Sequence, residues 1–241
     1  MTVMKLDIMA FGAHPDDVEL SAAGTLINQV KLGHKCGIVD LTKGELGTRG
    51  TADDRMKEAE IATQIMGIHV RENLGMSDGF FENDKENQLK IIEVIRKYQP
   101  EIILCNAITD RHIDHGRGSK LVSDAAFLSG LVKIETKNNG NPQEAWRPKA
   151  VYHYIQDRFL SPDFVVDISN SIQTKVDAIM AYRSQFYNPN SSEPETAISS
   201  KEFLEFLKGR WMEMGRPAGF QYAEGFTVER FPGINDLKNL V

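Results

Sequence analysis

Short apolar runs alternate with amphipathic segments along the first half of the chain. Runs of mostly apolar residues, bounded by polar or turn-forming residues, predict buried strands at 6–11, 36–41, 68–74 and 101–106. Between these runs, apolar side chains recur every three or four positions, which predicts helices at 17–32, 53–66 and 85–98. We expect an aspartate directly before the first helix to cap it and Gly33 to end it.

The second half continues the alternation less regularly. A helix is predicted at 116–134, a turn-rich connection at 137–148, strands at 150–155 and 163–168, helices at 170–182 and 200–214, and a final strand at 222–230. Residues 185–199 are rich in Asn, Pro and Ser, which predicts a mobile loop.

Strands that alternate with helices indicate right-handed βαβ units. We therefore expect a single α/β domain over residues 1–241, with a mostly parallel sheet and helices on both faces. In the common strand order 3-2-1-4, strand 6–11 lies beside strand 101–106, and ligands bind beyond the carboxyl ends of such strands.

Polar clusters follow these two strands. His14, Asp16 and Asp17 come directly after strand 6–11, and residues 110–115, Asp-Arg-His-Ile-Asp-His, come after strand 101–106. The expected strand order would bring His14, Asp17 and His115 into one crevice. Two neutral imidazoles and a carboxylate bind a divalent metal and leave positions open for water, and zinc is the usual metal in a hydrolase.

Such a site supplies the parts of a hydrolytic reaction. The metal lowers the pKa of bound water toward ~7, and a second carboxylate within reach takes the proton. The adjacent Asp16 and Asp17 offer both carboxylates, and one of them is also expected to cap the following helix. His112 and Asp114 are expected to pair, so that the carboxylate keeps the imidazole charged toward developing oxyanion charge.

The bulk properties narrow the class of protein. The chain has 241 residues and a formal charge of -6, a mild acidic excess that argues against nucleic-acid binding. No apolar run approaches the ~20 residues of a membrane span, and no signal-like segment opens the sequence. Cys36 and Cys105 fall in predicted buried strands and are expected to be reduced, so a cytoplasmic protein is expected.

At these residues the sequence resembles the LmbE-like family of zinc-dependent N-acetylglucosaminyl deacetylases. The matching segments are 13–17 with Glu19, the glycine-rich 44–50, and 110–115. The length of the chain and the segments 44–55 and 222–226 are most similar to the branch that deacetylates N-acetylglucosaminyl malate in bacillithiol biosynthesis. The resemblance implies a Rossmann-like fold and a homo-oligomer, a hexamer in relatives of this branch.

The resemblance also divides the roles of the cluster residues. It implies that His14, Asp17 and His115 bind Zn²⁺, with Fe²⁺ also suited to the same ligands. It makes Asp16 the general base. The departure from the family pattern is Ile113, which occupies a position that proline often fills.

The same resemblance implies that His112 faces the tetrahedral intermediate and that Asp114 orients it. Arg55 matches a substrate-contacting arginine of the family, and Tyr187 matches a mobile tyrosine near the oxyanion. From the residues alone, Arg49 and Arg111 are further candidates for binding an acidic aglycone, because arginine pairs with carboxylates in bidentate fashion.

Other functions fit parts of the pattern. Two histidines and a carboxylate also form the triad of Fe(II) oxygenases, although a spare carboxylate favours hydrolysis. A nucleotide-binding module would fit the fold, but Gly-x-Gly-x-x-Gly is absent after the first strand, and the glycines at 44, 47 and 50 match no phosphate-binding loop. An amidase or a deacetylase of another N-acyl compound would use the same site. In each enzymatic case the expected partner is a small molecule, with no nucleic acid or membrane.

Overall fold

A seven-stranded sheet forms the centre of the computed structural model, which describes residues 4–239. The strand order is β3-β2-β1-β4-β7-β9-β8. Its strands are β1 (Ile8–Gly12), β2 (Cys36–Thr42), β3 (Val70–Met76), β4 (Ile102–Cys105), β7 (Ala150–Tyr154), β8 (Phe164–Asp167) and β9 (Ala223–Val228). All pairings from β3 to β7 are parallel, and β9 is antiparallel to both of its neighbours. The predicted order 3-2-1-4 and the mostly parallel sheet are confirmed.

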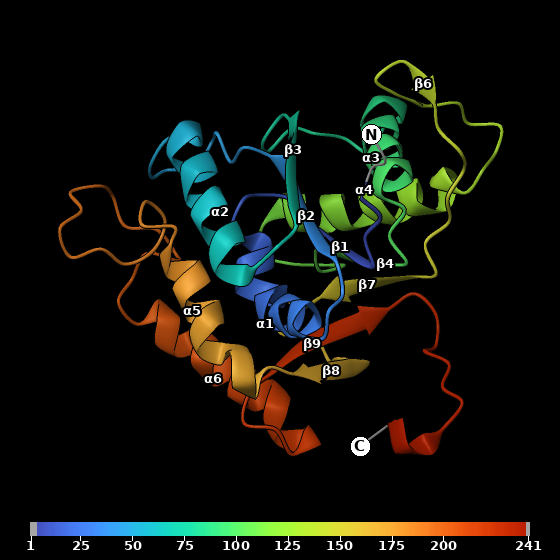
Figure 1. The fold of residues 1–241 in the computed structure, drawn as a ribbon. Coiled ribbons are helices and arrows are strands. Elements are labelled where there is room, and N and C mark those ends of the chain that lie inside the picture. Colours follow the sequence, from blue (N-terminus) through green and yellow to red (C-terminus); the bar gives the residue numbers. More distant parts are fainter. Residues whose placement is uncertain (1–3, 240–241) are drawn as a thin grey trace.

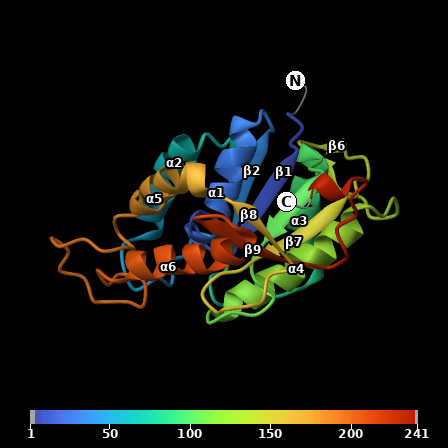
Figure 2. The ribbon, with the colours of Figure 1, turned by 90° about the horizontal axis from the view of Figure 1, so that it is seen from below.

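Helices cover both faces of the sheet (Figure 1). One layer contains α1 (Asp17–Lys31), α2 (Ala52–Met66), α5 (Ile172–Met180) and α6 (Phe203–Gly215). The other contains α3 (Lys85–Tyr98) and α4 (Ile113–Ser129). Each layer closes its own apolar cluster against the sheet. Figure 2 shows α6 lying alongside β9, at the border of the first layer.

The start of α1 differs from the prediction. Asp16 occupies the N-cap position, but its side chain accepts no capping hydrogen bond and its φ is 119°. Positive φ is rare for a residue with a side chain. The expected aspartate cap is therefore wrong, whereas Gly33, at φ 91°, does lie just beyond the end of α1 as predicted.

The second polar cluster runs into the first turn of a helix rather than lying wholly in a loop before one. Helix α4 begins at Ile113, three residues earlier than predicted, with His112 as its N-cap. It ends at Ser129, before the predicted residue 134, where Gly130 follows. The connection after it contains a short hairpin of β5 (Lys137–Asn138) and β6 (Asn141–Pro142), which the sequence pattern did not predict.

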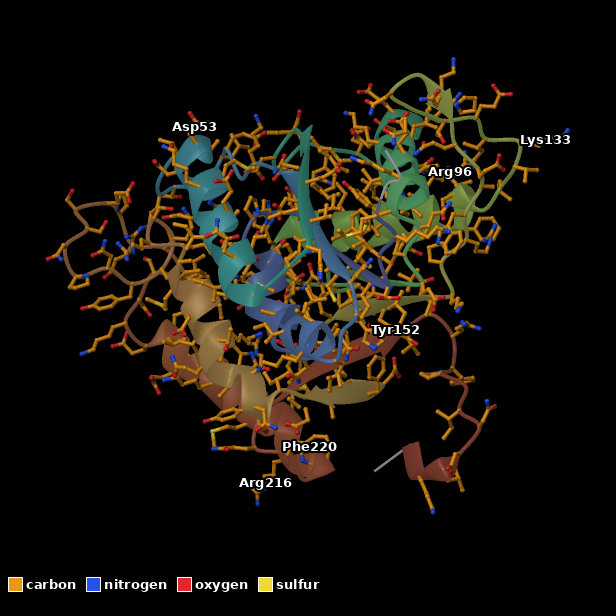
Figure 3. All side chains as sticks on the ribbon, viewed as in Figure 1. Asp53, Arg96, Lys133, Tyr152, Arg216 and Phe220 are labelled. Carbon is orange, nitrogen blue, oxygen red and sulfur yellow. The ribbon has the colours of Figure 1, made fainter. Side chains whose placement is uncertain are left out.

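Arg96 of α3 anchors this connection (Figure 3). Its guanidinium donates to the carbonyl oxygens of Ser129, Leu131 and Ile134 at 2.6–3.0 Å. These bonds satisfy the last carbonyl of α4, which has no helical partner, and two carbonyls of the connection that follows. Within residues 4–239, no helix is both long and apolar enough to cross a bilayer.

Candidate active site

The two predicted clusters meet at the carboxyl edge of the sheet. His14, Asp16 and Asp17 lie at the turn from β1 to α1, and the second cluster lies between β4 and the first turn of α4. Because β1 and β4 are parallel neighbours, both turns open on the same edge. Residues of both clusters line one cavity of about 300 Å³.

Asp17 lies between the two histidines predicted to bind metal with it. Its carboxylate is 3.6 Å from His14 Nδ1 and 3.0 Å from His115 Nε2. The opposite ring nitrogens contact further carboxylates: His14 Nε2 is 2.9 Å from Asp78 and His115 Nδ1 is 2.5 Å from Asp110. Metal-binding histidines typically contact a carboxylate through the nitrogen that does not bind the metal.

Two buried amides hold the Asp17 carboxylate from behind. Asn106 Nδ2 donates to Asp17 Oδ2 at 2.9 Å, and Gln156 Nε2 donates to Asp17 Oδ1 at 3.1 Å. The amides also join each other, and Asn106 Oδ1 accepts from the Ala13 backbone. Both residues lie just after strands, β4 and β7, and this position could have marked them as site candidates, but neither was among the predicted site residues.

The charges around the histidines fit a divalent cation. Burial opposes a charged His14, yet Asp114, Asp17 and Asp78 together raise its pKa well above the usual value. His115 behaves similarly: burial opposes its charge, but Asp17 and Asp110 raise its pKa to about 9. A ring nitrogen of His112 lies within 4.8 Å of ligand nitrogens of His14 and His115. The three histidines, and separately His14 with Asp78 and Asp114, lie close enough to hold a metal ion, and imidazole and carboxylate donors suit Zn²⁺ or Fe²⁺.

Asp16 is buried in the same cavity without a hydrogen-bond partner for Oδ2. Burial raises its pKa to about 7, and the neighbouring Asp17 acts in the same direction against the opposing charge of Arg55. Arg55 Nη2 lies 3.6 Å from Asp16 Oδ2, beyond hydrogen-bond distance. A carboxylate with this pKa is suited to accept and return a proton near neutral pH.

The expected pairing of the Asp114 carboxylate with the His112 imidazole is not formed. Asp114 instead accepts from the Gly79 backbone at 2.7 Å and from Arg117 at 2.8 Å. Its own backbone N–H donates to His112 Nδ1 at 3.3 Å, because His112 caps α4. Burial and the nearby histidines lower the pKa of His112, so we assign a neutral ring that carries its proton on Nε2.

The predicted substrate residues fall into two groups. Arg55 and Arg111 line the cavity, and Arg111 also contacts Asp157 at 2.8 Å. Arg49 is buried outside the cavity lining, where its Nε donates to the Ser184 carbonyl at 3.0 Å. Tyr187 is partly exposed and lines a separate pocket of about 70 Å³ beside α5 and α6. Substrate contacts by Arg49 and Tyr187 remain predictions.

Much of the cavity wall was not anticipated from the sequence. Helix α6 contributes a row of apolar residues, and Arg210 of the same helix donates to the Asp157 carbonyl. Asp78, in the polar stretch after β3, also lines the cavity. The spacing of these apolar residues in the sequence predicts an amphipathic helix, but it does not predict which part of the protein the apolar face packs against.

Comparisons with known proteins agree with this geometry. The family model described as PIG-L, GlcNAc-PI de-N-acetylase, matches residues 9–126, which include both polar clusters. The structure is similar to that of the conserved protein TT1542 from Thermus thermophilus, with a TM-score of 0.84 and 34% identity over 96% of this chain and 97% of that one.

Two curated relatives differ in their reactions. The diacetylchitobiose deacetylase of Thermococcus kodakarensis is 26% identical over 94% of this chain and 84% of its own length. The 4-oxalmesaconate hydratase of Pseudomonas putida is 24% identical over 77% of this chain and 76% of its own length. The segment that contains the clustered His and Asp residues thus matches the PIG-L family model, and the fold is shared with TT1542 over nearly the whole length of the chain.

Proposed function

We propose that the protein is a metal-dependent hydrolase that removes the acetyl group from an N-acetylglucosaminyl conjugate. The observation that carries this proposal is the pairing of two carboxylates in one cavity. Asp17 lies between two imidazoles, and Asp16 beside it is buried with a free oxygen. One carboxylate is thus arranged to bind a metal and the other to move a proton.

His14, Asp17 and His115 would hold the metal, which supplies an acidified water and polarises the acetyl carbonyl. Asp16 is placed to take a proton from the water whose oxygen attacks the carbonyl carbon. Neutral His112 donates a hydrogen bond from Nε2 to the oxyanion. Asp16 then returns the proton to the amine nitrogen as the C–N bond breaks, releasing acetate and the free amino sugar.

We further propose N-acetylglucosaminyl malate, as in bacillithiol biosynthesis, as the substrate, with Zn²⁺ as the first choice of metal. Arg55 and Arg111 in the cavity support an acidic aglycone, since guanidinium groups bind carboxylates. The resemblance also supports a homo-oligomer, a hexamer, which light scattering of the purified protein would test, and the unpaired Cys36 and Cys105 support a cytoplasmic location.

The decisive experiment is an acetate-release assay with metal-defined enzyme. The panel contains N-acetylglucosaminyl malate, other N-acetylglucosaminides and N,N'-diacetylchitobiose. Acetate release from any glycoside supports the deacetylase, and preference for the malate conjugate supports the narrower substrate. No acetate from any compound would reject the proposal, and hydration of 4-oxalmesaconate would then favour the chemistry named for the Pseudomonas relative.

The Asp16→Asn variant tests the role of Asp16 as the base independently of metal binding. Removing a general base typically costs ~10²–10⁴ in rate, so turnover should fall by that factor while the bound metal is retained. Metal content and acetate release are measured on the same preparation. Near wild-type turnover with metal bound would show that Asp16 is not the base.

A further inference from the structure

One stripe of α6 faces the active-site cavity. Phe203, Leu207, Trp211 and Met214 all line it, and their spacing of four, four and three residues places them on one side of the helix. At 1.5 Å per residue the stripe is roughly 16 Å long. Leu207, Trp211 and Met214 are buried.

Other elements extend this apolar surface. Leu20, one turn after Asp17 on α1, and Ile155, just after β7, line the same cavity. Ile198 adds a side chain from the segment before α6. Trp211 is held in place by the buried ammonium of Lys175, which lies 4.6 Å from the centre of its ring. The apolar wall is therefore fixed by packing from behind.

The reaction proposed above makes no use of this wall. An acetyl group offers one methyl, and malate offers carboxylates, which Arg55 and Arg111 suit better than aliphatic side chains do. Protein interiors are close-packed, and cavities of about 300 Å³ with mainly apolar walls and a few polar groups are typical of ligand sites. The wall thus matches an apolar group attached to the substrate.

We propose that the α6 stripe binds an apolar extension of the substrate beyond its N-acetylglucosamine unit. This rests on the proposed hydrolysis of an N-acyl glucosamine for the reacting group, and it favours a substrate other than the malate conjugate, which has no apolar extension. The extension belongs either to the aglycone or to an acyl chain longer than acetyl. Both place methylene groups against Leu207 and its neighbours.

The test measures binding and turnover in parallel. The aglycone series compares methyl with octyl N-acetylglucosaminide, and the acyl series compares N-acetyl with N-hexanoyl glucosamine. Calorimetry on the zinc-loaded Asp16→Asn variant gives Kd, and amine release by the zinc-loaded wild type gives kcat/KM. Each buried methylene is expected to tighten binding about threefold. The longer ligand of at least one series should bind at least about tenfold more tightly, with a negative heat-capacity change.

Two substitutions on α6 test whether the gain in binding with chain length arises at the stripe. Leu207→Gln puts a polar group into the stripe and should abolish the gain with chain length. Phe206→Gln is the matched control, because its side chain is 73% exposed and outside the cavity lining, and it should keep the gain. Ile198→Trp, which narrows the cavity at a half-buried position, replaces Leu207→Gln if that variant fails to fold.

The outcomes separate the two proposals. A gain in one series identifies whether the aglycone or the acyl chain lies on the stripe. No gain in either series, or a gain unaffected by the cavity variants, overturns the apolar subsite. Tighter binding of long ligands without amine release from any compound would support the subsite and reject the deacetylase.

Discussion

At the scale of single residues, the geometry of the proposed metal site depends on two neutral amides. Asn106 and Gln156 each donate to one oxygen of Asp17, and neither carries a charge of its own. They orient the carboxylate toward His14 and His115 without competing for a cation. Groups that orient ligands in this way typically contribute 10–100-fold to metal affinity.

Gln156→Met removes one of these donors with little change in volume. We expect the affinity of the metal-depleted enzyme for Zn²⁺ to fall roughly 10–100-fold, as measured by competition with a chelator. Gln173→Met is the control, since Gln173 makes its hydrogen bond to Asp177 on the exposed side of α5. Equal zinc affinity in the two variants would remove Gln156 from the support of the metal site.

The sequence identified the proposed reacting groups but not all of their hydrogen-bond partners. His14, Asp16, Asp17, His112 and His115 stand out because several titratable groups follow two strands. The pairing of His112 with Asp114 was wrong, because side-chain direction depends on where α4 begins. One residue of shift in a helix start rotates each following side chain by about 100°, given 3.6 residues per turn.

At the scale of elements, the glycine-rich turn after β2 makes room for Arg55. Gly44 has φ +65°, and a Cβ there would lie 1.9 Å from Arg55 Nη1. Gly44→Ala should therefore displace the guanidinium from Asp16 and raise KM for an acidic glycoside more than for free N-acetylglucosamine. Steady-state kinetics on both substrates tests this.

Gly75→Ala is the matched control for backbone strain. Gly75 also has positive φ, at +58°, but a Cβ there would meet nothing within 4 Å. It should lose stability by roughly 1 kcal/mol, as strained positions do, without the change in KM. A similar rise in KM in both variants would mean that strain, and not Arg55, is responsible.

A second element-scale contact joins β7 to α4 and to the segment after β9. His153 Nδ1 lies 2.8 Å from Ser119 Oγ, and Nε2 lies 3.0 Å from Glu229 Oε1. Burial opposes a charged His153, but contacts with Cys105 and Glu229 raise its pKa to about 10. The folded protein thus holds a proton that the unfolded chain loses near its ordinary pKa of 6.5.

The sign of the resulting pH effect follows from proton linkage. Because the folded pKa is the higher one, the stabilisation is complete below about pH 6.5 and is lost as the pH rises toward 10. Between pH 6 and 9 the free energy of unfolding should fall by on the order of 2 kcal/mol more in the wild type than in His153→Gln. Urea denaturation at both pH values measures this, and parallel pH profiles would contradict it.

At the scale of the whole molecule, a buried ion pair joins the helical layer to the sheet. Lys175 of α5 is fully buried and contacts Glu224 of β9 at 2.5 Å. Glu224 also accepts from the backbone of Gly24 and Thr25 in α1, at 2.9 and 2.7 Å. The pair thus connects α5 to α1 and β9, two elements that line the active-site cavity.

Lys175→Met should cost about 3–5 kcal/mol, because it leaves a buried carboxylate without its counterion. Adding Glu224→Gln removes that charge and should recover part of the loss. Denaturant midpoints at constant m-value measure both effects. A Lys175→Met variant as stable as the wild type would show that water, rather than Lys175, compensates Glu224.

The local pattern of apolar and polar residues was sufficient to predict the class of fold. Apolar runs of strand length that alternate with amphipathic helices predicted a mostly parallel sheet, and the order 3-2-1-4, taken from the common arrangement of such folds, is the order found. The same patterning placed both polar clusters at the carboxyl edge, since any turn that follows a parallel strand opens there. Helix ends and the β5–β6 hairpin were missed because they depend on contacts such as those of Arg96 with the end of α4.

The residues proposed to take part in the reaction could thus be identified from the sequence, because they lie within a few positions of a strand end. Their working arrangement was decided only in three dimensions. Asp17 acquires its amide supports from positions 89 and 139 residues away, and the cavity acquires its apolar wall from α6. Such contacts join segments whose proximity no local sequence pattern predicts. Only the packing of the whole chain therefore determines that Asp17 is fixed by hydrogen bonds and that Asp16 keeps an oxygen without a partner.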